Sequence, residues 1–221
     1  MSELGNLVPL IIINNIMKMY ELTGYKNFDI YKKAKEILGG DIRDKPLYAT
    51  LEEWQEIMET YGFTHLGTGS YGSVYEHPSY PWVFKVFKHD ITYLKFYNYV
   101  RRNQHNPNLP KIKGSYIKIG TDAYAVRLEK LTPITDEQYK NTMKLVNLFS
   151  YEVMNSNNDD IDIDQDIDPN TKKLIQKYYG IYEITNALYN SEIFGSDPLI
   201  DLNKSNIMMR DNVPVFTDPV A

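Results

Sequence analysis

The stretch Leu199-Ile-Asp-Leu-Asn-Lys-Ser-Asn-Ile-Met-Met-Arg-Asp-Asn-Val-Pro-Val-Phe-Thr-Asp218 places two acids and an amide around two short apolar runs. The runs Ile207–Met209 and Val213–Phe216 predict two β-strands. Between them, Arg210-Asp211-Asn212 is a cluster typical of a tight turn. The stretch therefore predicts a β-hairpin that brings the residue before its first strand close to the residues after its second.

Three polar side chains flank this hairpin. Asn206 precedes the first strand, Asp218 follows the second, and Asp201 lies five residues before Asn206. Carboxylate and amide oxygens suit hard cations, typically Mg²⁺ bound to nucleotide phosphates, so Asn206 and Asp218 are candidate metal ligands. Asp201 is then placed to face an incoming hydroxyl. Taken alone, the same residues are also ordinary loop and turn formers, and that interpretation stays open at this point.

A glycine-rich run begins at Gly67, in the sequence Gly67-Thr-Gly-Ser-Tyr-Gly-Ser-Val74. Gly67, Gly69 and Gly72 allow backbone N–H groups to approach phosphate with no Cβ in the way. A dinucleotide-binding fold needs a helix to begin inside such a run, but here the pattern continues as strand, turn and strand. We therefore expect a hairpin that covers phosphates, with Val74 on its second strand.

The next strand, Trp82–Phe87, carries Lys85. A lysine there can bind nucleotide phosphates, and the alternative is a solvated charge on an edge strand. Lys88 points to the opposite face of a strand and is the weaker candidate. Further on, Glu129-Lys130-Leu131 follows a β segment and is a candidate hinge, where the backbone of Glu129 and Leu131 would meet adenine.

The segments around these motifs predict a small α+β lobe and a helical one. A helix is expected from Asp90 to Arg102, with Ile91, Leu94, Tyr97 and Val100 inward, and strands over 115–119 and 123–128. Long helices are expected over 135–154 and from Pro169 onward, the second capped by Asp168 and with Leu174, Ile175, Tyr178, Ile181, Tyr182 and Leu188 inward. The acidic stretch 155–168 resembles a calcium loop but fails at its glycine and glutamate positions.

The first sixty residues predict helices over 7–17, 29–38 and 51–61, each with an apolar stripe. The apolar run 7–17 is too short to span a bilayer and lacks basic flanks, so no membrane association is expected. The chain has 221 residues, no cysteine and a net charge of -5. This composition excludes disulfides and thiolate chemistry, argues against nucleic acid as a partner, and fits a reducing cytoplasm.

The linear order of glycine run, strand lysine, Asp-x-x-x-x-Asn and final Asp is that of protein kinases. More closely, Phe63–Gly69, Val83–Val86, Asn206-Ile-Met and Val213–Val220 resemble the early serine/threonine protein kinases of bacteriophage T7 and its relatives. This resemblance implies ATP and Mg²⁺ as cofactors and host proteins as substrates, in the cytoplasm of the infected bacterium. It also implies catalysis by Asp201 and metal binding by Asn206 and Asp218.

The sequence departs from the wider kinase pattern in several places. No glutamate occurs between Asp90 and Ile119, so that only Asp90 or Glu76 could replace the usual partner of the lysine. Pro219 and Val220 replace the usual residues after the metal aspartate. Two alternatives therefore stay open: an inactive nucleotide-binding module that grips a host protein, and a small-molecule phosphotransferase.

The expected fold is α+β: a minimal two-lobed, protein-kinase-like fold with a helical N-terminal extension and a truncated C-lobe. We expect the extension over residues 1–62, a nucleotide lobe with five strands and one helix over 63–131, and a reduced helical lobe over 132–221. The glycine run and Lys85 fall in the first lobe, and the Asp201–Asp218 stretch falls in the second.

Overall fold

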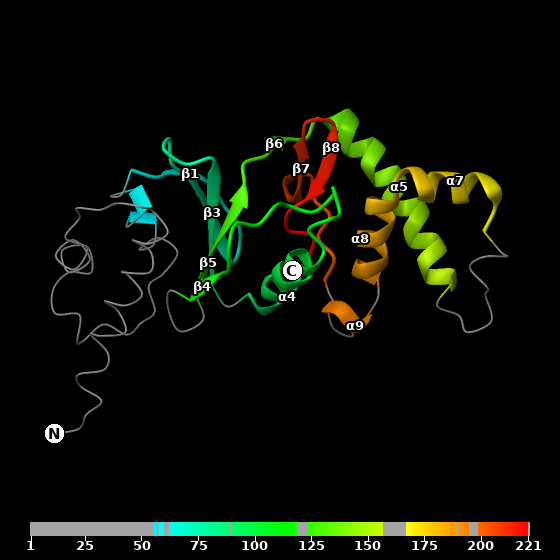
Figure 1. Ribbon diagram of the computed structural model, residues 1–221, viewed down its shortest axis with the longest axis horizontal. Coiled ribbons are helices and arrows are strands. Elements are labelled where there is room, and N and C mark those ends of the chain that lie inside the picture. Colours follow the sequence, from blue (N-terminus) through cyan, green and yellow to red (C-terminus); the bar gives the residue numbers. More distant parts are fainter. Residues whose placement is uncertain are drawn as a thin grey trace, which may run out of the picture. The chain divides into compact units, whose positions relative to one another are not determined.

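A computed structural model describes residues 55–56, 58–59, 62–88, 90–118, 123–156, 167–189, 191–194 and 199–220 (Figure 1). The helices expected before residue 55 and most of the acidic stretch lie outside these residues. The chain divides into two compact units. Unit 1 comprises Met1–Asp90 and Ile112–Lys130, and unit 2 comprises Ile91–Lys111 and Leu131–Ala221.

Unit 1 is built on a five-stranded antiparallel sheet with the order β1-β2-β3-β5-β4. Its strands are β1 (Thr64–Thr68), β2 (Gly72–Glu76), β3 (Trp82–Lys88), β4 (Ile117–Lys118) and β5 (Ala123–Glu129). The strands predicted over 73–76, 82–87 and 123–128 are thus confirmed, whereas the one predicted over 115–119 is shorter. The sheet brings the glycine run beside β3, the strand that carries the candidate lysine.

An aromatic cluster closes one end of this sheet. The ring of Phe63 lies 5.1 Å from that of Phe84 in an edge-on arrangement and 5.0 Å from that of His77. Tyr80 completes the cluster, 5.0 Å from His77. Packed aromatic pairs of this kind contribute more stability than their buried area alone would give. The contacts of His77 and Tyr80 therefore stabilise the turn between β2 and β3.

Unit 2 begins with α4 (Ile91–Arg102), for which the predicted inward face is partly wrong. Ile91 is 72% exposed, while Tyr93, Phe96, Tyr97 and Val100 are buried. The two extra aromatic side chains bury more surface than an isoleucine can, and they set which face of the helix turns inward.

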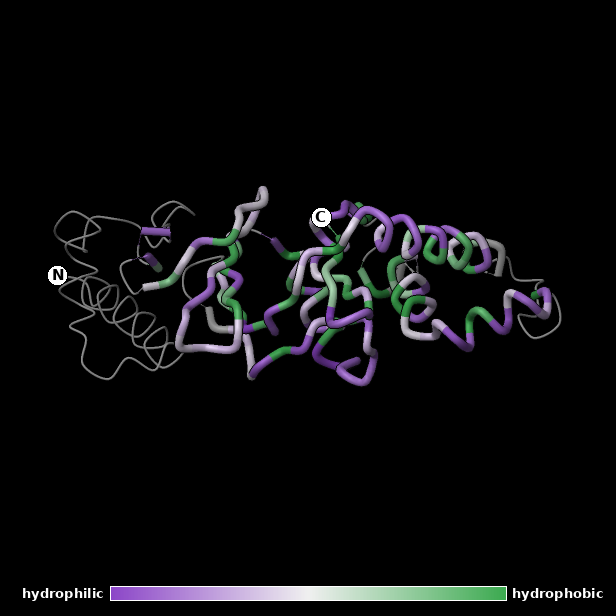
Figure 2. Tube along the Cα trace, turned by 90° about the horizontal axis from the view of Figure 1, so that it is seen from above, coloured by the Kyte–Doolittle hydropathy of each residue, from purple (hydrophilic) through white to green (hydrophobic). Residues whose placement is uncertain are grey.

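The long helix α5 (Asp136–Ser156) starts with a reciprocal cap. The Thr135 N–H donates to Gln138 Oε1 at 3.0 Å, and the Gln138 N–H donates to Thr135 Oγ1 at 3.2 Å. Along α5, hydrophobic and hydrophilic residues alternate at helical spacing (Figure 2). Its buried Phe149 packs edge-on against Tyr182, at 5.7 Å between ring centroids, and this contact joins α5 to α8 (Tyr179–Tyr189).

The helix predicted from Pro169 onward is two helices. Its start is confirmed, because the Asp168 side chain accepts from the N–H groups of Asn170 and Thr171. However, α7 (Pro169–Lys177) ends at Tyr178, whose φ of -118° is not helical, and α8 follows after this break. A short helix, α9 (Ser191–Phe194), comes next. Among the residues that the structure describes, no helix is long and apolar enough to cross a membrane.

The predicted hairpin at the end of the chain is confirmed. The 3₁₀ turn η1 (Lys204–Asn206) leads into β7 (Ile207–Arg210), and a two-residue turn leads to β8 (Val213–Phe216). Asp211 adopts a positive φ of 54° in that turn, a conformation that aspartate tolerates better than most residues. With β6 (Thr132–Pro133), the hairpin forms a three-stranded sheet of order β6-β7-β8. Both outer strands, β6 and β8, contain a proline.

Candidate nucleotide and metal site

The glycine run forms the connection between β1 and β2, as predicted. Inside it, the Gly69 N–H donates to the Gly72 carbonyl at 2.8 Å, and the Lys88 N–H donates to the Tyr71 carbonyl at the same distance. The side chain of Tyr71 is half exposed at the tip. These backbone bonds shape a tight loop that leaves its outer surface open.

The three glycines of this loop differ in how closely other atoms approach them. A Cβ at Gly72 would lie 2.9 Å from the Val86 carbonyl oxygen and 3.1 Å from the Cβ of Phe87, so only glycine fits there. A Cβ at Gly67 would meet nothing within 4 Å, and one at Gly69 only the Gly72 carbonyl at 3.9 Å. Packing within the described part of the chain therefore explains Gly72, whereas it does not require glycine at Gly67 or Gly69.

Lys85 lies on β3, the central strand of the sheet, and is 7% exposed. Its cross-strand neighbours are Val74 on β2 and Val126 on β5, so these three side chains share one face. The alternative of a solvated edge-strand charge is wrong, because Lys85 is buried and its strand has a neighbour on each side. Lys88 is three residues further on, has its side chain on the opposite face, and is half-buried.

Glu76, one of the two predicted replacements for the missing glutamate, forms an ion pair with Lys130. Lys130 follows Glu129, the last residue of β5, which is opposite Trp82 in the register. The chain passes from unit 1 to unit 2 between Lys130 and Leu131, which is half-buried. The segment predicted as a hinge is therefore one of the three places where the chain crosses between the units.

In unit 2, backbone hydrogen bonds join the loop that carries Asp201 to the residues around Asp218. The Asp201 N–H donates to the Pro219 carbonyl at 2.9 Å, and Ile200 forms a β-bridge with Val220. The Asn206 carbonyl accepts from the Thr217 N–H at 2.8 Å and from the Thr217 hydroxyl at 3.0 Å. Asp218 is therefore flanked on both sides by residues that are bonded to the Asp201–Asn206 loop.

The side chains of this loop are arranged in a way that fits a cation. Asn206 uses its Nδ2 to donate to the Asp201 carbonyl at 3.1 Å, which leaves its Oδ1 as the atom that could bind a metal. Asp218 is half-buried and its Oδ1 is shielded from solvent, so water would screen its charge poorly against a bound cation. Tyr139 on α5 donates its hydroxyl to the Leu202 carbonyl at 2.9 Å and fixes the loop from the helical side.

The predicted site residues thus form two groups. Gly67, Gly69, Gly72, Val74, Lys85 and Glu129 belong to unit 1, whereas Leu131, Asp201, Asn206 and Asp218 belong to unit 2. In unit 1, the three glycines and Val74 lie on the β1–β2 hairpin, Lys85 is opposite Val74 on β3, and Glu129 ends β5. In unit 2, hydrogen bonds join Asp201 and Asn206 to the residues beside Asp218, and Leu131 lies outside this loop system.

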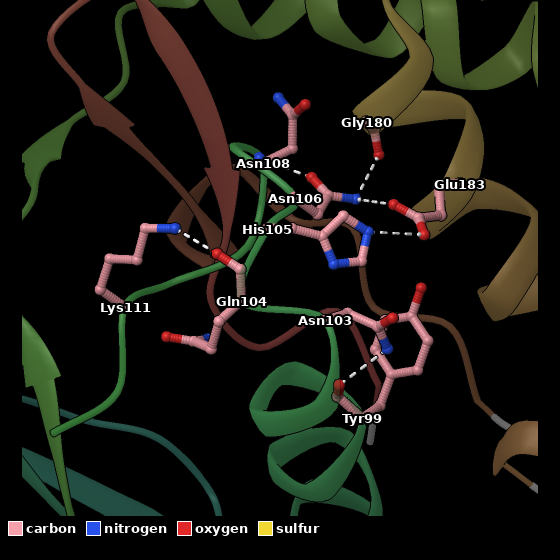
Figure 3. A network of polar contacts seen from close by, with 9 residues as sticks. All are labelled: Tyr99, Asn103, Gln104, His105, Asn106, Asn108, Lys111, Gly180 and Glu183. Atoms are coloured by element: carbon pink, nitrogen blue, oxygen red, sulfur yellow. Dashed lines mark hydrogen bonds and ion pairs between the residues drawn. The ribbon is translucent and has the colours of Figure 1, made fainter. Parts of the chain in front are cut away.

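A polar network behind the β7–β8 hairpin was not predicted from the sequence. Its central members are Asn106 and Asn108, in the loop after α4, together with Gly180 and Glu183 on α8 (Figure 3). Burial raises the pKa of the nearby Tyr99 phenol, and the Glu183 carboxylate adds to the shift, so Tyr99 stays neutral. The Asn-Pro-Asn sequence after a helix was the available signal, but it gives no indication of what the asparagines contact.

The β1–β2 and β7–β8 hairpins lie on an α+β framework, as the sequence predicted. Residues 39–221 match the family described as bacteriophage T7 protein kinase 0.7. The match covers most of the chain, and the chain belongs to this family. A comparison with curated protein sequences found no significant match.

Three solved structures show a more distant similarity, each with 16% sequence identity. The streptomycin–ATP complex of APH(2″)-IIa has a TM-score of 0.33, with 78% of this chain and 72% of that chain covered. The gentamicin complex of the same enzyme has a TM-score of 0.34, with 79% and 72% covered. ADP-bound aminoglycoside phosphotransferase APH(2″)-Ib has a TM-score of 0.33, with 78% and 72% covered. At these scores the assignment rests on the family match.

Proposed function

We propose that this protein is an ATP-dependent serine/threonine protein kinase that phosphorylates host proteins in the cytoplasm of an infected bacterium. The observation that carries the proposal is the hydrogen-bonded loop in which Asn206 and Asp201 hold the residues on both sides of Asp218. Phosphoryl transfer to a hydroxyl uses a carboxylate to orient the hydroxyl, and an amide and a second carboxylate to bind the metal. Asp201, Asn206 and Asp218 supply these groups in the proposal. Membership of a protein kinase family supports the same activity.

In the proposed mechanism, unit 1 binds the nucleotide. The backbone at Gly67 and Gly69 covers the phosphates, and Gly72 allows the loop to turn tightly against β3. The buried ammonium of Lys85 binds α- and β-phosphate oxygens, where low exposure strengthens the attraction. Val74, on the same face, contacts the base, and the backbone at Glu129 and Leu131 supplies its hydrogen bonds.

Unit 2 supplies the reaction itself. Asn206 and Asp218 would hold Mg²⁺, which offsets negative charge on the β- and γ-phosphates. The acceptor hydroxyl oxygen forms a bond to the γ-phosphorus, the bond from that phosphorus to the bridging oxygen breaks, and ADP leaves. Asp201 orients the hydroxyl and accepts its proton.

The test is transfer from ATP labelled at the γ-phosphate, with bacterial lysate proteins and aminoglycosides offered as separate acceptors. We expect labelled phosphoserine and phosphothreonine, and a loss of at least about a hundredfold in Asp201→Asn, the usual contribution of a positioned acid or base. Asp211→Asn is the matched control, because it makes the same change of side chain in the turn between β7 and β8, away from Asp201. Label on the aminoglycosides alone would indicate a small-molecule phosphotransferase. ATP binding without any transfer would indicate an inactive binding module.

A further inference from the structure

The loop Asn106–Leu109, here called the asparagine loop, attaches to the outer edge of β8. The Asn108 carbonyl accepts from the Phe216 N–H at 2.9 Å, and the Asn108 Nδ2 donates to the Pro214 carbonyl at 2.7 Å. Asn108 itself is 5% exposed. One asparagine therefore supplies both an acceptor and a donor to the same strand.

The register of the sheet explains why this edge needs a partner. The strand β8 is outermost in the order β6-β7-β8 and pairs with β7 along its inner edge. Backbone groups of successive residues point to opposite edges of a strand, so Pro214 and Phe216, two residues apart, present theirs to the same edge. Asn108 occupies the position that a fourth strand would take beside these two residues.

The asparagine loop also holds β7. Arg210, the last residue of that strand, donates from Nη1 to the Pro107 carbonyl at 2.7 Å and from Nη2 to the Leu109 carbonyl at 2.9 Å. Both strands of the hairpin are thus bonded to the same four residues. A shift of the asparagine loop would move the two strands together.

Behind the asparagine loop, a buried amide network fixes it to α8 (Figure 3). Asn106 Oδ1 accepts from the Asn108 N–H at 2.7 Å, and Asn106 Nδ2 donates to the Gly180 carbonyl at 2.9 Å and to Glu183 Oε2 at 2.8 Å. A Cβ at Gly180 would lie 2.3 Å from Asn108 Oδ1 and 2.7 Å from Asn106 Oδ1. The two amides therefore contact the helix backbone directly, with no room between them.

We infer that Asn108 is a positioning residue for the metal site, an inference that rests on the proposed role of Asp218. Asp218 follows Phe216 by two residues, and Thr217 between them is bonded to Asn206. Asn108 fixes one side of this short segment and Asn206 fixes the other. Without the Asn108 contact, the carboxylate of Asp218 loses its fixed distance from the Asn206 amide, and binding of the cation weakens.

The main test is Asn108→Asp, which keeps the shape of the side chain and removes the donor to the Pro214 carbonyl. We expect the Mg²⁺ concentration for half-maximal ATP turnover to rise about tenfold, the size typical for residues that orient metal ligands. Turnover at saturating Mg²⁺ should change much less. The matched control is Asn103→Asp, because among the described residues the hydrogen bond of its side-chain amide is to the Tyr99 carbonyl of α4 and not to the hairpin. An unchanged Mg²⁺ dependence in folded Asn108→Asp would overturn the inference.

A second measurement separates this inference from the proposed activity. Amide hydrogen exchange at Phe216 and Thr217, measured without nucleotide or metal, should be about tenfold faster in Asn108→Asp than in Asn103→Asp. If the unaltered protein transfers no phosphate, the proposed function is wrong. Equal exchange rates in the two variants would overturn the positioning role of Asn108, whether or not the protein is active. If Asn108→Asp does not fold, Arg210→Gln is the second variant. It removes the two hydrogen bonds from β7 to the asparagine loop, at a position less buried than Asn108. It should raise the Mg²⁺ requirement about threefold, and an unchanged requirement there would equally overturn the inference.

Discussion

The β1–β2 hairpin and the β7–β8 hairpin carry the two halves of the proposed site, but they are held in different ways. Four of the five residues of β1 are exposed, and the tip of its hairpin is held by backbone bonds and by a hydroxyl pair, Thr68 with Ser73 at 2.9 Å. In β7 and β8, by contrast, Ile207, Val215 and Phe216 are fully buried. Hydrogen bonds also attach both strands to the asparagine loop. Asn108 bonds to β8, and Arg210 of β7 bonds to the backbone of the loop.

This difference matches what each hairpin would have to do. A loop that covers nucleotide phosphates has to admit ATP and release ADP, and lightly anchored segments open at low free-energy cost. A pair of metal ligands has to stay at one separation, since an error of a few tenths of an ångström weakens cation binding. We expect substitutions at the exposed positions of the first hairpin to change the free energy of unfolding little. Changes to the supports of the second hairpin should lower it.

The largest expected effect concerns the nucleotide side. Lys85→Ala should lower phosphoryl transfer by about a hundredfold or more, because the buried ammonium is lost from the face that receives the phosphates. Lys88→Ala is the control on the opposite face of the same strand and should retain normal transfer. The measurement is the initial rate with labelled ATP, together with nucleotide affinity by calorimetry. Loss of binding in Lys88→Ala alone would mean that the opposite face of the sheet binds ATP.

The next prediction breaks the support of the β7–β8 hairpin. Gly180→Ala should lower the free energy of unfolding by about 3 kcal/mol, because the new Cβ overlaps the side-chain oxygens of two buried asparagines, Asn106 and Asn108. Urea unfolding, followed by circular dichroism, measures this change. Asn186→Ala is a control on an exposed position of the same helix and should stay within about 0.5 kcal/mol of the unaltered protein. Equal stability of both variants would show that the asparagine side chains can move away from the added Cβ at little cost.

A third prediction compares two glycines within the β1–β2 hairpin. Gly72→Ala should cost about 1–3 kcal/mol of unfolding free energy, because its Cβ would press on the Val86 carbonyl. Gly67→Ala should change stability by less than about 0.5 kcal/mol, since nothing lies within 4 Å of the added atom. The same unfolding measurement applies. A large loss for Gly67→Ala would show that the loop is held more firmly than its contacts indicate.

The smallest expected effect is at an exposed ion pair beside the Asp201–Asn206 loop. Lys204 donates to the Asp136 carboxylate at 2.7 Å, and this hydrogen bond, with the lysine charge, holds the pKa of Asp136 below its usual range. The stabilisation is therefore present above the ordinary aspartate pKa of about 3.9 and is lost as the pH falls further. Lys204→Met should lower the unfolding temperature by no more than about 2 °C at pH 7, and by nothing at pH 2. A larger shift at neutral pH would mean that this pair helps to hold the loop.

Local patterns were sufficient to predict most of what each hairpin looks like. The glycine run, the lysine on the following strand and the turn at Asp211 are each specified by residues close together in sequence, so spacing alone identified them. The start of α7 was predictable for the same reason, because Asp168 and Pro169 form a helix start by themselves. By contrast, the burial of Ile91 was predicted wrongly, since the inward face of a helix depends on which neighbours compete for the core.

The support of the β7–β8 hairpin could not be predicted in this way. Asn106 bonds to Gly180, and Asn108 to Pro214 and Phe216, so each contact joins residues far apart in the sequence. An asparagine that forms such a contact looks, in sequence, like any turn residue. The break at Tyr178 was not predicted either, although Gly180 follows two residues later.

The prolines in the three-stranded sheet have a further consequence. Pro133 lies in one outer strand and Pro214 in the other, and neither has an N–H to offer along an open edge. An open edge is where a strand of another molecule adds on and starts aggregation. Because the edge at β8 is also occupied by Asn108, a neighbouring copy finds no continuous row of donors and acceptors there. This arrangement protects the sheet against strand addition when the protein accumulates at high concentration, and the protection is independent of any activity at the site.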